Sequence, residues 1–97
     1  MMLDETAIPV REPVRGACEL LGLDPLHVAC EGRLVAFCAA SDADRVLTAM
    51  RETPGGEAST RVGEVIDDPR GFVQLRTGLG GLRLIDWLSV DQLPRIC

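Results

Sequence analysis

Residues 60–88 read TRVGEVIDDPRGFVQLRTGLGGLRLIDWL, and this stretch decides the fold that we expect. It contains three apolar runs, which predict strands over residues 60–67, 71–77 and 82–88. Asp68-Pro69-Arg70-Gly71 is a tight-turn sequence that joins the first two runs. The glycine-rich residues 78–81 join the last two. A phosphate-binding loop would need a helix after its glycines, and a strand follows here, so we interpret residues 78–81 as a hairpin turn.

Two helices are expected upstream of these strands. Residues 13–21 carry an apolar stripe at helical spacing that includes Cys18, which we interpret as a buried hydrophobic side chain. Gly22 is suited to end this helix in the left-handed conformation. The second helix is expected to start at Ser41, which can cap it, with Asp44 in the first turn, where a negative charge suits the helix dipole.

Two further regions complete the expected sheet. Residues 3–8 predict a short strand ended by Pro9. Residues 26–40 predict a hairpin that turns at Glu31-Gly32, and its second arm, residues 34–40, is typical of a central strand covered on both faces. The order of elements predicts an α+β fold with a ferredoxin-like split βαβ arrangement. We expect a mainly antiparallel sheet, two helices on one face and this hairpin added.

The composition bounds the size of the core and the classes of partner. With 97 residues the chain forms one domain at most, with an aliphatic core in which Phe37, Phe72 and Trp87 are the few large side chains. The net charge is −5, all ten basic residues are arginine, and no basic stretch is interleaved with aromatic residues, which argues against a nucleic-acid partner. No apolar run is long enough to span a membrane.

The four cysteines are interpreted as reduced thiols of a cytoplasmic protein. No signal peptide and no CxxC spacing accompany them, and the chain has one histidine, which makes it a poor source of metal ligands. We expect Cys38 to lie in the core with Cys18. Cys97, the last residue, is different, because its sulfur can be threaded into a narrow pocket, modified there and withdrawn. The alternative is an accidental surface cysteine.

Five short motifs are spread along the chain: Ala7-Ile8-Pro9-Val10, Arg15-Gly16-Ala17-Cys18-Glu19-Leu20-Leu21-Gly22-Leu23-Asp24-Pro25-Leu26, Gly63-Glu64-Val65, Gly80-Gly81 and the terminal Pro94-Arg95-Ile96-Cys97. Together they resemble the HypE family of nickel–iron hydrogenase maturation proteins, within the superfamily of aminoimidazole ribonucleotide synthetase and selenophosphate synthetase. Members of that family are much longer than this chain. The resemblance therefore implies that residues 1–87 form part of a C-terminal α+β domain and resemble its second half. Residues 88–97 lose the apolar periodicity, which predicts a flexible tail that ends in Cys97.

The resemblance also implies a reaction. In this family the carbamoyltransferase HypF places a carboxamide on the sulfur that corresponds to Cys97. ATP, with magnesium, then activates the carboxamide oxygen, the group is dehydrated to a thiocyanate, and the cyanide passes to iron on the HypC–HypD scaffold. The family's ATP-binding domain precedes the part that this chain resembles, so we expect no cofactor bound to this chain and no ATP turnover from it alone.

Glu31 is the candidate base for deprotonating the amide, because the resemblance places it in the hairpin where the family commonly has Ala-Asn-Glu-Gly. The alternative is an ordinary turn glutamate. Cys30 stands where the family has asparagine, which removes a hydrogen-bonding side chain from this site.

Two other functions are considered: a non-catalytic module that docks on the maturation partners, and a structural domain with an inert end. An incomplete sheet would also favour a homo-oligomer through its open edge.

Overall fold

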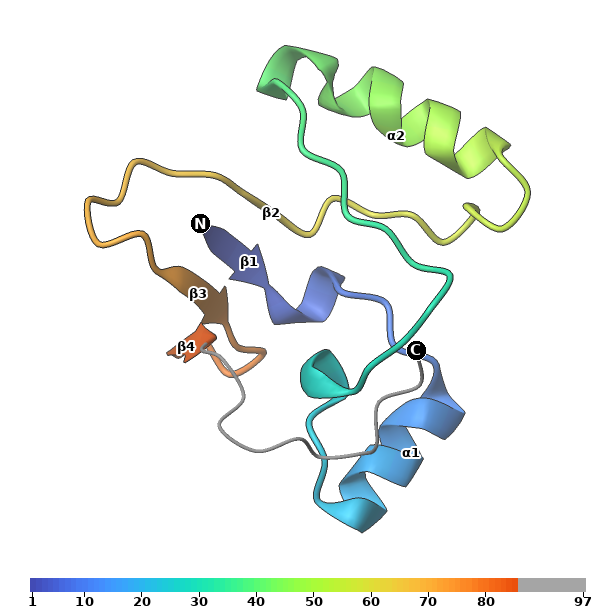
Figure 1. Ribbon diagram of the computed structural model, residues 1–97, viewed down its shortest axis with the longest axis vertical. Coiled ribbons are helices and arrows are strands. Elements are labelled where there is room, and N and C mark those ends of the chain that lie inside the picture. Colours follow the sequence, from blue (N-terminus) through green and yellow to red (C-terminus); the bar gives the residue numbers. More distant parts are fainter. Residues whose placement is uncertain (86–97) are drawn as a thin grey trace. The chain divides into compact units, whose positions relative to one another are not determined.

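The computed structural model describes residues 1–85 of the chain, which form two compact units (Figure 1). Within the described range, one unit comprises residues 1–9 and 37–85, and the other comprises residues 10–36. The first unit contains the sheet and one helix, and the second contains the other helix. No helix in the described range is long and apolar enough to cross a membrane.

The sheet has four short strands in the order β2-β1-β3-β4 (Figure 1). The strands are β1 (Met2–Asp4), β2 (Gly63–Glu64), β3 (Val73–Arg76) and β4 (Leu82–Ile85). β1 lies between β2, with which it pairs antiparallel, and β3, with which it pairs parallel, and β3 pairs antiparallel with β4. The α+β class and the mainly antiparallel sheet are therefore confirmed.

The centre of the sheet is the parallel pair of β1 and β3. Leu3 lies opposite Leu75, whose side chain is 0% exposed and forms the core of this unit. The backbone continues the pairing beyond the strand ends: the Met1 nitrogen donates to the Phe72 carbonyl at 2.9 Å, and the Gln74 nitrogen donates to the Met1 carbonyl at 2.9 Å. On the other side, β1 is held to β2.

Three strands are shorter than the sequence predicts, and local hydrogen bonds explain the first case. The predicted strand 3–8 ends at Asp4, whose carboxylate accepts from the Thr6 nitrogen at 3.0 Å and from its hydroxyl at 2.7 Å. These bonds start a 3₁₀ helix over Glu5–Ala7 instead. The predicted strand 60–67 shrinks to β2, and the predicted strand 71–77 shrinks to β3.

The turn before β3 is where the sequence places it, but it does not make a hairpin. The Gly71 nitrogen donates to the Asp68 carbonyl at 2.9 Å, which closes the turn. β2 and β3 flank this turn but do not pair with each other, because β1 is inserted between them. The hairpin turn between β3 and β4 at residues 78–81 is confirmed.

The prediction of a hairpin over residues 26–40 is wrong. Its first arm begins with a 3₁₀ helix over Pro25–His27, and residues 33–39 form neither strand nor helix. Cys38, expected in the core, is exposed. A central strand needs a neighbour on each side, and within residues 1–85 no strand pairs with this segment.

Helix α1 (Glu12–Leu21) agrees with the sequence prediction. Pro13 lies in its first turn, and Gly22 ends it with φ 67°, the left-handed conformation. The Leu23 nitrogen closes the end of the helix by donating to the Cys18 carbonyl at 2.9 Å. The Cys18 side chain is 6% exposed, so its interpretation as a buried hydrophobic residue is confirmed.

Helix α2 (Ala43–Glu52) begins differently from the prediction. Ser41 makes no capping bond, because it lies inside a short 3₁₀ helix over Ala40–Asp42 that leads into α2. Asp44 does lie in the first turn, as expected. Since α1 and α2 belong to different units, the arrangement of both helices on one face of the sheet stays a prediction.

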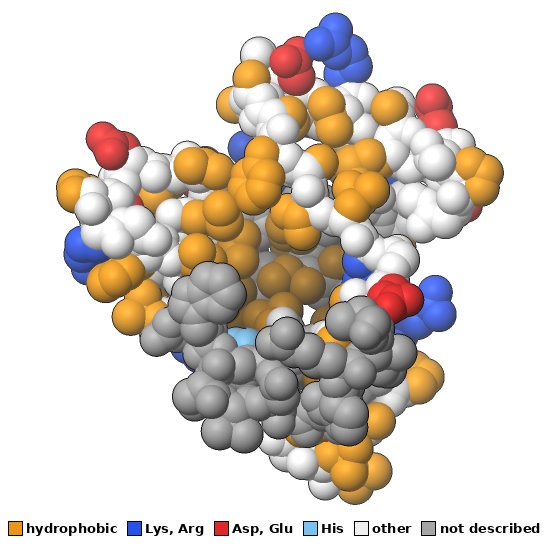
Figure 2. Space-filling view, in the orientation of Figure 1, with side chains coloured by type: hydrophobic (Ala, Val, Ile, Leu, Met, Phe, Trp, Pro, Cys, Tyr) orange, Lys and Arg blue, Asp and Glu red, His pale blue; other side chains and the backbone are white. Residues whose placement is uncertain are grey.

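The core is smaller than the composition suggests. Within residues 1–85, Cys18 and Leu75 are the only buried side chains. Phe37 and Phe72, expected as core residues, are 67% and 38% exposed, and Trp87 lies outside the described residues. Hydrophobic side chains are correspondingly visible on the surface of both units (Figure 2).

Candidate functional site

The two predicted site residues are treated differently by the structure. Cys97, together with the predicted tail over residues 88–97, lies outside the described residues. Glu31 is described and is exposed, in the loop that follows α1. The chain bends at Glu31 and Gly32, and Gly32 has φ 74°, a conformation that glycine adopts without strain. The turn that the sequence predicts here is therefore present, although the strands on either side are not.

The start of this loop is fixed by Asp24. Its carboxylate accepts from the Leu26 nitrogen at 3.0 Å and thereby caps the 3₁₀ helix over Pro25–His27. The second carboxylate oxygen of Asp24 lies 3.3 Å from Nδ1 of His27. Both side chains are partly buried, so the contact between Asp24 and His27 helps to pack the start of the loop.

Glu31 has the exposure that a base needs to receive a substrate. Among residues 1–85 the Glu31 carboxylate makes no hydrogen bond and no ion pair, so it faces solvent. Cys30, immediately before it, is also exposed. The carboxylate can therefore accept a proton from a group that is brought to this loop, but nothing in the described residues selects that group.

The glycine-rich turn at residues 78–81 does not fit a nucleotide phosphate. Three of its four backbone nitrogens already donate within the chain: Gly78 to a carboxylate oxygen of Glu5 at 3.2 Å, Gly80 to the Thr77 carbonyl at 3.0 Å, and Gly81 to the Thr77 hydroxyl at 3.1 Å. The negative charge of Glu5 would also repel a phosphate. The described residues therefore offer no cradle for ATP at their most glycine-rich loop.

A shallow hollow of about 270 Å³ lies where β1 meets β2, and the sequence analysis did not find it. Its charged side chains are two carboxylates and two guanidinium groups, namely Asp4, Glu64, Arg61 and Arg76. The pairing of the strands brings these groups together, since Asp4 lies opposite Arg76 and Met2 opposite Glu64. Positions so far apart in the sequence give no local signal; only the register of the sheet would have revealed the hollow.

Hydrogen bonds tune the acidity of Asp4 at the rim of this hollow. The hydroxyl of Thr6 lowers the pKa of the Asp4 carboxyl most, and the Thr6 backbone nitrogen and the charge of Arg76 lower it further. The ionised form of Asp4 is thus favoured, and its Oδ1 caps the 3₁₀ helix by accepting both bonds from Thr6. This role is structural, and we assign Asp4 no chemistry.

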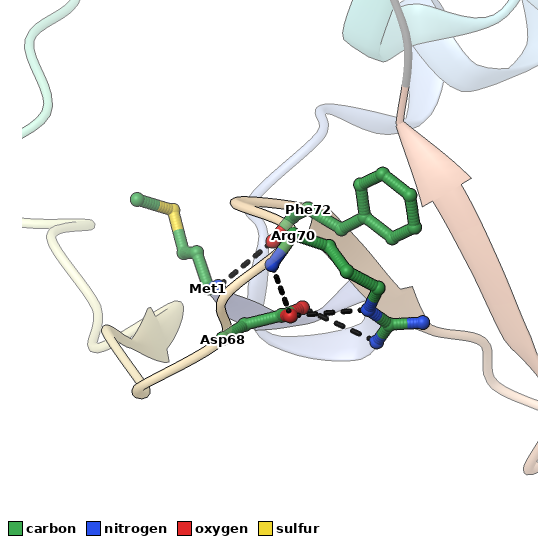
Figure 3. Close-up of polar contacts among 4 residues, drawn as sticks. All are labelled: Met1, Asp68, Arg70 and Phe72. Atoms are coloured by element: carbon green, nitrogen blue, oxygen red, sulfur yellow. Dashed lines mark hydrogen bonds and ion pairs between the residues drawn. The ribbon is translucent and has the colours of Figure 1, made fainter.

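A second charged contact in the sheet unit, between Asp68 and Arg70, is also structural (Figure 3). The Asp68 carboxylate accepts from the Arg70 backbone nitrogen at 3.0 Å and from its guanidinium at 3.0 and 3.2 Å. These bonds from Arg70 lower the pKa of Asp68 and raise that of Arg70. The Arg70 guanidinium also lies 4.7 Å from the centre of the Phe72 ring. The cluster fixes the turn that leads into β3.

Within residues 1–85 no group of His, Cys, Asp and Glu side chains is placed to hold a metal ion.

The chain belongs to the family described as AIR synthase related protein, C-terminal domain, whose sequence pattern matches residues 1–76. Within that class it is similar to HypE proteins. It is 65% identical over 97 residues to the carbamoyl dehydratase HypE of Cupriavidus necator and 59% identical over 97 residues to that of Azotobacter vinelandii. Each match covers 100% of this chain but 28% of the relative. The resemblance that the motifs predict is confirmed.

Solved structures agree with this assignment. A crystal structure of the hydrogenase maturation protein HypE superposes with a TM-score of 0.91 at 44% identity, covering 99% of this chain and 32% of that one. The structure of HypE in complex with ATP superposes with a TM-score of 0.86 at 40% identity, and the match covers 94% of this chain and 29% of that one. The structure of a HypE–HypF complex superposes with a TM-score of 0.81 at 34% identity, and the match covers 88% of this chain and 27% of that one. The chain thus has the fold of one part of these longer proteins.

Proposed function

We propose that this chain is the carrier part of a HypE-type carbamoyl dehydratase, which matures nickel–iron hydrogenases. The observation that carries the proposal is its 65% identity, over all 97 residues, to a relative named for that activity. Cys97 lies within the matched region. In this role a HypF-type carbamoyltransferase supplies the carboxamide, and a HypC–HypD scaffold receives the cyanide, in the cytoplasm.

The residues of this chain have two tasks in the reaction. The sulfur of Cys97 holds the carboxamide throughout, since a thiolate forms the bond readily and can leave again when the group is transferred. To form the nitrile, the amide nitrogen loses two protons and the carbon loses its oxygen, which departs as phosphate. The Glu31 carboxylate accepts one of these protons, and the other passes to solvent. ATP and magnesium supply the activation of that oxygen, and we assign their binding to the ATP-binding domain that the family carries outside the part matched here. In the loop at residues 78–81 the nitrogens of Gly78, Gly80 and Gly81 already donate within the chain.

The other function that we retain is a docking module without catalysis. It is supported by the coverage of the comparisons, because this chain spans 28% of the length of the curated relatives and 27% of the HypE chain in the complex with HypF. In that case the chain would bind HypF or the HypC–HypD scaffold without Cys97 being modified. The two functions differ in whether a carboxamide appears on the thiol.

Intact-mass spectrometry separates the two functions. The folded chain is incubated with a HypF-type carbamoyltransferase, carbamoyl phosphate and ATP, and the modified residue is mapped. We expect one carboxamide, located on Cys97 and absent from Cys97→Ser. The matched control is Cys30→Ser, which removes an exposed thiol and keeps the modification. Binding of the carbamoyltransferase without any mass increase would support the docking module instead.

The role of Glu31 is tested in a chimera in which this chain replaces the matching part of the Cupriavidus relative. We expect Glu31→Gln to slow thiocyanate formation by about 10²- to 10⁴-fold, with carbamoylation of Cys97 unchanged. Glu64→Gln is the control, since Glu64 is another exposed glutamate of the chain. Equal rates in the Glu31→Gln and Glu64→Gln proteins would show that Glu31 is an ordinary turn residue.

A further inference from the structure

The charged side chains around the hollow between β1 and β2 are not all paired. On the side of β3, Asp4 lies opposite Arg76, and Oδ1 of Asp4 accepts two hydrogen bonds from Thr6. On the side of β2, the exposed side chains of Arg61 and Glu64 make no hydrogen bond and no ion pair with the rest of the described chain. The hollow therefore offers a ligand one guanidinium group and one carboxylate that have no partner within the described range.

The register of the strands brings an apolar surface to the same hollow. Residues directly opposite each other in a sheet point to the same face, as do residues two positions apart in a strand. Glu64 lies opposite Met2. Asp4 follows Met2 by two positions and lies opposite Arg76, so all four side chains share one face of the sheet. Met2 and Val62 are half-buried and line the hollow, and a ligand there thus meets charges of both signs beside a small apolar surface.

We infer that this hollow binds a small zwitterion, an α-amino acid with a short aliphatic side chain. The Arg61 guanidinium holds the ligand's carboxylate and the Glu64 carboxylate holds its ammonium group, both through charge-assisted hydrogen bonds. A simple anion such as phosphate is less suitable, because the carboxylates of Glu64 and Asp4 repel it. The volume of about 270 Å³ also favours a small ligand, since sites for drug-sized molecules measure roughly 300–1,000 Å³. All lining residues belong to the sheet unit and Glu31 to the other, so the inference does not rest on the proposed function.

A titration followed by nuclear magnetic resonance tests the ligand class. L-Valine is added to the nitrogen-15-labelled chain of 97 residues at constant pH and ionic strength. We expect saturable shifts of the amides of residues 2–4 and 61–64, with a dissociation constant on the order of 1 mM because the hollow is shallow. Isovalerate lacks the ammonium group of valine and isobutylamine lacks its carboxylate. Each should bind at least about tenfold more weakly, since each loses one of the two charge-assisted contacts.

Matched substitutions test the two charged residues. Arg61→Gln and Glu64→Gln should each weaken the binding of L-valine at least about tenfold. Arg11→Gln and Glu52→Gln are the controls, because both residues are exposed, lie outside the hollow and give the same changes of net charge. The dispersion of the amide spectrum verifies that each variant is folded. Three results would overturn the inference: no saturable shift with L-valine, equal weakening in the control variants, or binding of isovalerate or inorganic phosphate as tight as that of L-valine.

Discussion

Residues 34–38 are more apolar than β3, yet β3 is the strand. The sequence of β3 is Val73-Gln74-Leu75-Arg76, with two polar residues, and it has β1 on one side and β4 on the other. Residues 34–38 have no polar side chain other than a cysteine and no neighbour within residues 1–85. The difference shows that pairing, rather than apolar composition, decides which extended segment becomes a strand.

The largest expected effect comes from comparing a core residue of β3 with a residue of the unpaired segment 34–38. Leu75→Ala should destabilise the isolated chain by about 2–5 kcal/mol, because it empties a fully buried site. Val35→Ala, which also shortens an aliphatic side chain, should change the stability by less than about 0.5 kcal/mol. Urea unfolding followed by circular dichroism measures both. Similar losses in the two variants would show that residues 34–38 are already packed in the isolated chain.

The next effect concerns the edge of the paired region, where β2 approaches β1 closely. A Cβ atom on Gly63 would collide with the Met2 carbonyl oxygen and the Leu3 side chain. Gly63→Ala should therefore cost about 1–3 kcal/mol of unfolding free energy. Thermal unfolding checks the value, with Gly78→Ala as control, since a Cβ there meets only the Thr6 methyl group at ordinary contact distance. A neutral Gly63→Ala would mean that β2 is not held to β1.

A smaller effect tests whether the helix upstream of residues 34–38 folds by local rules. Gly22→Ala forces a Cβ atom into the left-handed conformation and should cost about 1–2 kcal/mol. Gly16→Ala lies within α1, where a Cβ has open space, and should stabilise by about 0.5–1 kcal/mol. The two glycines lie six positions apart in the sequence. Gly22→Ala should lower the helix content and the thermal midpoint and Gly16→Ala should raise both, and this opposition would assign the effect to the backbone conformation of Gly22.

The smallest expected effect is a pH dependence at the turn before β3. Bonds from Arg70 hold the pKa of Asp68 below its ordinary value of 3.8 in the folded chain. The stabilisation is thus complete above the pKa of the unfolded chain and is lost as the pH falls through the lower folded value. Unfolding midpoints at about pH 5 and pH 3 should differ less in Asp68→Asn than in the original chain. An unchanged pH dependence in Asp68→Asn would assign the acid sensitivity to other carboxylates, such as Asp4.

The predictions from sequence succeed where structure depends on neighbours along the chain. The end of α1 at Gly22 and the hairpin turn at residues 78–81 follow from residues a few positions apart. The prediction for the start of α2 is wrong although it also depends on residues a few positions apart, because a 3₁₀ turn through Ser41 competes with the expected cap. The strand prediction for residues 34–40 fails for another reason: sequence periodicity shows that a segment needs partners but not whether they are present.

The candidate site likewise has features that local sequence predicts and features that it does not. The dipeptide Glu31-Gly32 is enough to predict a turn, and the structure has a bend there. The role of Glu31 as a base comes from the family resemblance and stays a prediction. The hollow between β1 and β2 escapes prediction because Asp4 and Arg76 meet only through strand register. The role of Cys97 stays a prediction, because the residue lies outside the described range.

The parallel pairing of β1 with β3 has a consequence for the order of events during synthesis. The backbone bond between Met1 and Phe72 joins positions 71 residues apart. At the usual rate of translation, roughly 5–20 residues per second, the first strand therefore waits about 4–14 s for its central neighbour. Residues 34–38 emerge during that interval, before β3 is complete. The step that closes the centre of the sheet is therefore a slow, long-range one.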